Sequence, residues 1–313
     1  MIARIWRGWT TPENADAYQR KEPTMSTAGS GAAGAAPPAG LAGAFELGGV
    51  APVNRLGFGA MRLPGVWDAR APQQAHRLLR RAVELGVTLI DTAHAYGPET
   101  SERLIAEALR PYPRELVVAT KAGYGPRGAR GWAPDGRPET IRRHCQRSLA
   151  ALGTDRIDLL QLHTLDPAVP IEESVGAMVE LQAQGKVAMI GVANVSLQEL
   201  DRARAVAEVV SVQNRYHLGE RASEEVLVAC ERSGIAFVPW FPLGAGALAR
   251  ADQLQAVASA HGATAAQVAL AWLLQRSPML LPIPGTSSIT HLEENVAAAG
   301  LRLTADEVRR ISG

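Results

Sequence analysis

The sequence predicts an α/β protein built as one (β/α)8 TIM barrel with an N-terminal β-hairpin. From Phe45 onwards, short apolar runs alternate with stretches of helical periodicity about eight times, which is typical of strand–helix units around a parallel sheet. Three of the apolar runs end at or next to a titratable residue, namely Asp91, Lys121 and His163. Because the C-terminal ends of barrel strands share one face, this placement predicts a single site at that face.

The individual elements follow from local patterns. Continuous apolar runs indicate buried parallel strands, and periodic ones indicate helices. Gly48-Gly49 predicts the turn of a hairpin over 45–55, and Gly86 and Gly234 lie where a helix C-terminal cap belongs. The predicted strands are 56–61, 87–91, 116–121, 157–163, 187–192, 209–213, 235–240 and 279–283, and the predicted helices are 72–85, 100–110, 138–152, 171–184, 196–207, 223–233, 251–260, 264–276 and 290–299.

A doubly wound open sheet is the alternative fold for alternating strands and helices. It normally has fewer strands, and a glycine-rich nucleotide loop follows its first strand. Arg62-Leu-Pro-Gly follows the first predicted strand here, and this is no such loop. A GxGxxG match at 123–128 also follows a strand, but Pro126, Pro134 and Pro138 predict a loop where a Rossmann motif needs a helix. The barrel is therefore favoured.

The chain divides by composition into two parts. Residues 26–44 are rich in Gly, Ala, Ser and Pro, which is typical of a flexible linker. We expect residues 1–44 to form a disordered N-terminal extension and residues 45–313 to form the barrel. Met25 offers an alternative start of the chain.

The composition of the chain limits the kinds of molecule that it is expected to bind. A net charge of +1 provides no basic stripe for nucleic acid, and no apolar run has membrane-spanning length. The two cysteines, Cys145 and Cys230, form no CxxC pair, so neither a disulfide framework nor a metal site is expected. These features favour a cytoplasmic protein with a small-molecule substrate and no metal. The oligomeric state stays open.

The residues at the predicted mouth suit carbonyl chemistry. A phenol has a pKa of about 10, and a nearby ammonium lowers it, so Lys121 is expected to activate Tyr96 as a general acid. Asp91 would hold Lys121, and His163 would orient a carbonyl oxygen. Each residue alone has an ordinary explanation, such as a loop cap or a core histidine, but four at strand ends favour a site. Hydride requires a nicotinamide cofactor, because protein side chains cannot supply it.

Three motifs carry a resemblance to a known family. Asp91-Thr-Ala-His-Ala-Tyr96-Gly, Ala-Thr-Lys121-Ala-Gly and Leu-Gln-Leu-His163 resemble the catalytic tetrad of the aldo-keto reductases, and the likeness covers essentially 45–313. It implies reduction of an aldehyde or ketone to an alcohol with NAD(P)H, with Tyr96 as general acid. A cofactor-sensing or regulatory, partner-binding barrel with little turnover is the alternative. Substrate identity and physiological direction stay open.

The resemblance also implies residues around the nicotinamide. The family's carboxamide-binding Ser-Asn pair falls on Ala193-Asn194, so only the amide carries over. Gln213 matches the family's glutamine at the end of the next strand, and Tyr216 matches the aromatic residue that stacks on the nicotinamide.

The last loop resembles the family's clasp for the adenosine phosphate. Gly285 to Ser288 precede a helix N-terminus, which is a suitable environment for a phosphate. Many members have a lysine at position 285 and an arginine at 291, where this chain has Gly285 and His291. NADPH remains the expected cofactor, and NADH remains possible. The implied residues in this loop are Gly285, Thr286, Ser287, His291, Glu294 and Asn295.

Aromatic residues near the strand ends are further candidates. Trp132, in the loop expected to cover the mouth, is a candidate substrate contact. Trp67, Trp240 and Phe241 fit either barrel packing or the substrate wall. His94 is interpreted as a loop residue within reach of substrate.

Overall fold

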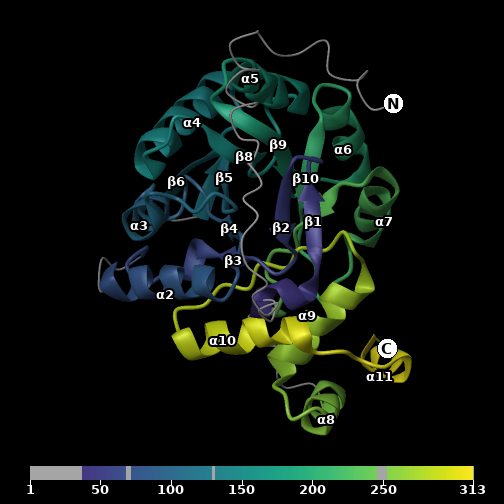
Figure 1. Ribbon diagram of the computed structural model, residues 1–313. Helices are drawn as coiled ribbons and strands as arrows, with labels where there is room; N and C mark the ends of the chain where they lie inside the picture. The colour runs from purple at the N-terminus through teal and green to yellow at the C-terminus, as the bar shows by residue number, and fades with distance from the viewer. Residues whose placement is uncertain (1–36, 68–71, 129–130, 245–251, 313) are drawn as a thin grey trace, which may run out of the picture. The chain divides into compact units, whose positions relative to one another are not determined.

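A parallel sheet of seven strands forms the centre of the described structure (Figure 1). The computed structural model describes residues 37–67, 72–128, 131–244 and 252–312, with backbone only for 126–128. The strands pair in the order β11-β10-β9-β8-β5-β4-β3, so barrel neighbours follow chain order. They are β3 (Phe58–Gly59), β4 (Leu89–Asp91), β5 (Val117–Ala122), β8 (Ile157–Leu162), β9 (Val187–Ala193), β10 (Val209–Gln213) and β11 (Ala236–Phe237).

The segment 279–283 closes the sheet into a barrel. Leu281 N donates to Phe237 O at 2.9 Å, and Gly57 N donates to Pro282 O at 3.0 Å. The segment thus lies between β11 and the start of β3. It was predicted as a strand but forms no regular ladder, because prolines such as Pro282 have no N–H to donate. The closed arrangement confirms the predicted (β/α)8 barrel.

Helices surround the strands on the outside (Figure 1). The predicted helices are all present, with boundaries that agree to within a few residues. The helix α11 at the C-terminal end of the chain was not predicted. The helices are α2 (Pro72–Glu84), α3 (Thr100–Leu109), α4 (Pro138–Leu152), α5 (Ile171–Ala183), α6 (Leu197–Arg204), α7 (Glu224–Ser233), α8 (Asp252–Ala260), α9 (Ala265–Arg276), α10 (Ile289–Ala297) and α11 (Ala305–Ser312).

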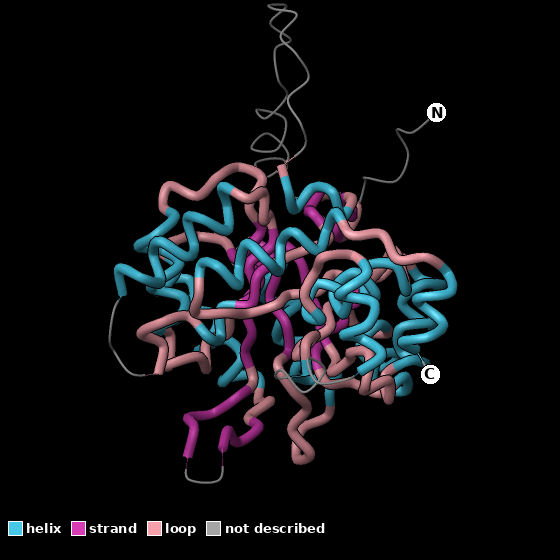
Figure 2. Tube along the Cα trace, turned by 90° about the horizontal axis from the view of Figure 1, so that it is seen from below, coloured by secondary structure: helices cyan, strands magenta, loops and turns pink. Residues whose placement is uncertain are grey.

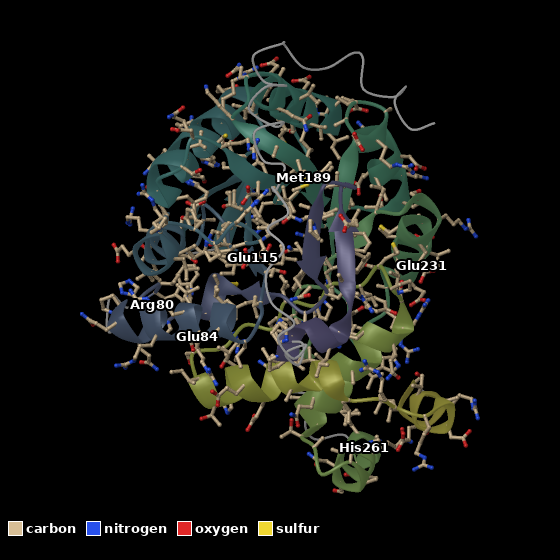
Figure 3. The ribbon with its side chains drawn as sticks, in the orientation of Figure 1. Arg80, Glu84, Glu115, Met189, Glu231 and His261 are labelled. Atoms are coloured by element: carbon tan, nitrogen blue, oxygen red, sulfur yellow. The ribbon has the colours of Figure 1, made fainter. Side chains whose placement is uncertain are left out.

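The predicted hairpin is present and covers the N-terminal end of the barrel. β1 (Ala44–Leu47) and β2 (Ala51–Asn54) pair antiparallel, and Gly48 and Gly49 have φ of 59° and 68°, values that favour glycine. Leu47 and Val53, each 1% exposed, belong to the cluster inside the barrel together with Met189. Figure 3 shows Met189 beside the hairpin tip. The open mouth therefore lies at the opposite, C-terminal end.

The ordered unit begins before the expected boundary at residue 45. A short 3-10 helix, η1 (Pro38–Ala42), buries Ala39 and Ala42, and Ala39 N donates to Leu85 O at 3.0 Å. Residues 37–44 therefore belong to the barrel unit and not to a linker. Residues 1–36 lie outside the described part of the chain, so their expected disorder stays a prediction.

The segment after β5 forms a hairpin where a loop was expected. β6 (Tyr124–Gly128) pairs antiparallel with β7 (Gly131–Pro134). Figure 2 shows this hairpin projecting beyond the ends of the barrel strands. The segment is not helical, as its prolines predicted, so the GxGxxG match at 123–128 is no Rossmann motif.

We expect Gly59→Ala to weaken the closure of the barrel. A Cβ at Gly59 would lie 2.7 Å from Ile283 O, a backbone atom that cannot yield without moving the chain. Such overpacking costs about 1–3 kcal/mol, measurable by urea unfolding. Gly176→Ala in α5 is the control, because a Cβ there meets nothing within 4 Å, and it should stabilise by about 0.5–1 kcal/mol. A Gly59→Ala protein as stable as wild type would show that this contact is not tight.

Candidate active site

A buried ion pair lies at the C-terminal ends of β4 and β5. Asp91 is the last residue of β4, and Lys121 is in β5. Lys121 Nζ donates to Asp91 Oδ1 at 2.6 Å and to Thr92 O at 2.8 Å. Lys121 is 1% exposed and Asp91 is 4% exposed, so the pair is shielded from water.

Amide side chains on two further strands, β8 and β10, extend this polar layer. Gln213 Nε2 donates to Asp91 Oδ2 at 2.8 Å and to Gln161 Oε1 at 3.3 Å. Gln161 Nε2 donates to Ser211 Oγ at 3.1 Å, and a Cβ at Gly191 would collide with that hydroxyl. Both carboxylate oxygens of Asp91 therefore have partners. No role was predicted for Gln161 or Ser211. A polar residue inside an apolar strand run could have indicated a buried polar contact.

Tyr96 and His163 lie against the same ion pair. Lys121 Nζ is 5.4 Å from the centroid of the Tyr96 ring. The His163 ring meets that phenol edge-on, with centroids 5.8 Å apart. Tyr96 is in the turn after β4 and His163 directly follows β8, and both are 7% exposed. The four residues predicted as catalytic are thus brought together.

Burial sets the protonation of these groups. It raises the pKa of Tyr96 above its usual value, and Asp91 and Tyr124 raise it further. The net shift of this pKa is therefore upward, opposite to the lowering expected from Lys121, because burial is its largest cause. Burial, and then Lys121, holds the pKa of His163 well below its usual 6.5. At neutral pH the phenol keeps its proton and the imidazole is uncharged.

Aromatic rings surround the phenol on its open side. Trp132 lies 6.2 Å from Tyr96 and stacks on Tyr124 at 5.7 Å, and Tyr124 meets His163 edge-on at 4.5 Å. Trp67, 44% exposed, lies 6.0 Å from Trp132. Trp67 and Trp132 therefore both lie beside Tyr96 at the mouth. Tyr124 was overlooked because it lies inside the misleading GxGxxG match.

Asn194 and Trp240 form a second polar contact at the mouth. Asn194 directly follows β9 and has φ of 58°, in the left-handed region. Its Nδ2 donates to His163 O at 2.9 Å, and Trp240 Nε1 donates to its Oδ1 at 2.8 Å. Asn194 is exposed and Trp240 is partly exposed, so a ligand in the mouth can reach both.

Tyr216 does not fit the role predicted for it. Its side chain is 0% exposed, stacks on Trp272 at 6.1 Å and meets Phe237 edge-on at 5.7 Å. Its hydroxyl donates to Glu224 Oε2 at 2.5 Å. The ring packs against the helix layer and offers no free face to a nicotinamide. Trp240, by contrast, is partly exposed.

The predicted phosphate clasp is one continuous segment around the start of α10. Ser288 N donates to Thr286 Oγ1 at 3.1 Å, and His291 N donates to Ser288 Oγ at 3.4 Å. A Cβ at Gly285 would lie 2.6 Å from Gly59 O, so the lysine of many relatives cannot occupy this position without a backbone shift. Ser287 and His291 are exposed, Glu294 is partly buried, and Asn295 is 5% exposed. Exposed hydroxyls ahead of a helix N-terminus suit a phosphate.

Comparison with known proteins agrees with this geometry. A family model described as the aldo/keto reductase family matches residues 55–313. The chain belongs to the aldo/keto reductase family. It is therefore an NAD(P)H-dependent oxidoreductase, as predicted.

Other members of the aldo/keto reductase family are similar over most of the chain. An uncharacterised oxidoreductase of Schizosaccharomyces pombe is 44% identical over 88% of this chain and 90% of its own length. Pyridoxine 4-dehydrogenase of Escherichia coli is 42% identical over 83% of this chain and 94% of its own. An aldo/keto reductase of Klebsiella pneumoniae, solved with NADP and acetate, has a TM-score of 0.75 and 29% identity over 86% of this chain and 93% of its own.

The described residues contain neither a candidate metal cluster nor a single helix suited to span a membrane. Within them, no group of three or more His, Cys, Asp or Glu residues could hold a metal ion. No single helix in the described part of this aldo/keto reductase is long and apolar enough to cross a membrane.

Two stacked histidines lie behind the site. His94 and His144 have ring centroids 4.0 Å apart and are 6% and 5% exposed. His94 N donates to Lys121 O at 3.1 Å, and Gly123 N donates to His144 Nδ1 at 3.4 Å. The pair thus joins the Tyr96 turn to α4 and to the end of β5. His94 is packed against α4, so the expected reach toward substrate is not what the structure shows.

This histidine pair predicts loss of stability in acid. Burial, with Arg143 and Arg147 nearby, lowers the pKa of His94 to about 4 and of His144 to about 3. The unfolded chain, with histidine pKa values near 6.5, binds more protons between about pH 4 and 6.5. Their contribution to stability is therefore complete above pH 6.5 and is lost as pH falls through that window.

His144→Phe, which keeps a ring but cannot be protonated, should flatten this dependence when urea unfolding is measured from pH 4 to 7. Tyr112→Phe, which removes a hydroxyl that donates to Leu152 O and does not ionise between pH 4 and 7, serves as the control and should leave the slope unchanged. An unaltered slope in His144→Phe would rule out the pair as its source.

Proposed function

We propose that this protein reduces an aldehyde or ketone to an alcohol with NADPH, and that Tyr96 is the general acid. The observation that carries the proposal is the meeting of Tyr96, His163 and the Lys121–Asp91 pair in one buried layer at the barrel mouth. NADPH, when bound, supplies the hydride that side chains cannot.

The protonation states favour proton donation by Tyr96. Burial keeps the proton on the phenol until a carbonyl oxygen with growing negative charge arrives to accept it. Lys121 then lies close enough to stabilise the phenolate that remains, while Asp91 and Thr92 hold Lys121 in place. The uncharged His163 can donate a hydrogen bond that orients the carbonyl oxygen without removing the phenol proton.

The proposed cofactor site runs from Asn194 at the mouth to the start of α10. Asn194 and Gln213 would bind the carboxamide, and Trp240 would support the nicotinamide ring in place of Tyr216. The segment 285–295 would hold the adenosine phosphate at the start of α10. The Klebsiella relative solved with NADP supports NADPH over NADH.

The aromatic mouth favours planar, largely apolar carbonyl substrates. Trp67, Tyr124 and Trp132 present ring faces and edges around the phenol, and such rings pack well on another aromatic ring. The 42% identical pyridoxine 4-dehydrogenase makes pyridoxine and its 4-aldehyde the first compounds to test. The alternative of a regulatory, partner-binding barrel with little turnover gains no support, because all four candidate catalytic residues lie together in one site.

The setting proposed for this activity is the cytoplasm. Cys145 and Cys230 are both buried and unpaired, as expected of a protein kept in reducing surroundings. The partner proposed is a small molecule rather than a nucleic acid, because the net charge is only +1.

Tyr96→Phe should reduce carbonyl turnover by about 10²–10⁴-fold, because it removes the proton donor while keeping the ring. NADPH oxidation at 340 nm with a panel of aldehydes measures this effect. NADPH binding, followed by fluorescence quenching, should be nearly unchanged. Turnover near the wild-type rate would refute Tyr96 as the acid.

Trp240→Leu should raise the Kd for NADPH by about tenfold, the effect of losing a stacking contact worth about 1 kcal/mol or more. Tyr216→Phe should leave that Kd unchanged and lower the free energy of unfolding by about 1 kcal/mol, because it loses only the hydrogen bond to Glu224. The opposite pattern, with cofactor affinity lost in Tyr216→Phe, would return the stacking role to Tyr216.

A further inference from the structure

Arg215 lies in the layer directly above the catalytic residues. Along β10, Ser211 and Gln213 face the barrel interior, where they bond Gln161 and Asp91. Asn214 and Tyr216 face the helices, where they bond Ser223 and Glu224. Side chains alternate along an extended strand, so Arg215 follows Gln213 on the interior side. A parallel bridge between Arg215 and Trp240 continues the sheet to this level.

Two aromatic rings hold the Arg215 guanidinium. Its central carbon lies 5.7 Å from the centroid of the Trp240 ring and 5.6 Å from that of Phe241. Such cation–π contacts fix a guanidinium without using its N–H groups. Phe241 has φ of 62°, an uncommon conformation for a bulky residue, and strained backbone of this kind occurs mainly at functional sites.

The donors of Arg215 remain available to a ligand. Arg215 is exposed, and among the described residues no carboxylate forms an ion pair with it. In the buried layer below Arg215, Lys121 pairs with Asp91 and burial keeps His163 uncharged. An oxyanion that enters the mouth would therefore meet a fixed, unmatched guanidinium with parallel N–H donors.

We infer that Arg215 is an anion-binding residue of the active-site mouth, which pairs with a phosphate or carboxylate oxyanion. The inference rests on the proposed function for the identity of the mouth. The oxyanion has two possible sources, a phosphate of the dinucleotide or an acidic group on the substrate. Both present the same chemistry to a guanidinium.

The test compares Arg215→Met, which keeps a long apolar side chain on the rings, with Arg215→Lys, which keeps the charge but loses the paired donors. The probes are NADPH, 4-nitrobenzaldehyde and 4-carboxybenzaldehyde, and calorimetry gives NADPH affinity. Arg156→Gln, at an exposed arginine before β8 on the opposite end of the barrel, is the control and should change nothing. Loss of a charged hydrogen bond predicts a change of about 10- to 100-fold in Arg215→Met and a smaller one in Arg215→Lys.

The pattern of loss identifies the source of the oxyanion. A raised Kd for NADPH with equal losses on both aldehydes would assign a cofactor phosphate. An unchanged Kd with kcat/KM lost only on 4-carboxybenzaldehyde would assign a substrate anion. If Arg215→Met changes neither, the inference is overturned.

The design also separates this inference from the proposed function. Wild-type protein that oxidises no NADPH with any aldehyde would refute the proposed function alone. In that case calorimetric binding of NADPH and of 4-carboxybenzyl alcohol to wild type and Arg215→Met still decides the role of Arg215.

Discussion

The Lys121–Asp91 ion pair is the constraint around which the barrel interior is arranged. Two charges removed from water are destabilising unless each finds further hydrogen bonds. Thr92 O accepts from Lys121, and Gln213 donates to the second oxygen of Asp91. Gln213 in turn requires Gln161, and the amide of Gln161 requires Ser211. One ion pair therefore accounts for a polar layer that crosses several strands, while the cluster below it stays apolar.

Burial makes the Lys121–Asp91 pair depend on further hydrogen bonds. It also sets the protonation states of Tyr96 and His163. A shielded phenol holds its proton, and a shielded imidazole beside an ammonium stays neutral. In the proposed reaction, Tyr96 would therefore release its proton when negative charge develops on a ligand. In the proposed reaction Lys121 would stabilise the phenolate left by that transfer, while burial keeps the pKa of the resting phenol high.

Local patterns in the sequence were sufficient to predict the fold and the proximity of the four candidate catalytic residues. Apolar runs and glycine caps located the strand–helix units, and strand ends placed Asp91, Lys121 and His163 on one face. Whether a side chain faces the barrel interior or the helices could not be predicted from these patterns. Tyr216 and Trp240 both follow strands, but only the observed alternation shows that Tyr216 faces the helices. The β6–β7 hairpin was missed because its prolines hid the strands. The segment 279–283 was predicted as a strand from its apolar run. It forms no regular ladder because proline has no N–H to donate.

The seam between the first barrel strand and the segment 279–283 has a mechanical consequence. Gly59 and Gly285 meet there backbone to backbone, and Pro282 withholds a donor, so this joint is tight in space yet poor in hydrogen bonds. With few hydrogen bonds to break, such a joint resists local opening less than a regular strand pair does. The start of α10 belongs to the same seam. A molecule bound along it would therefore hold the two sides of the barrel closure together.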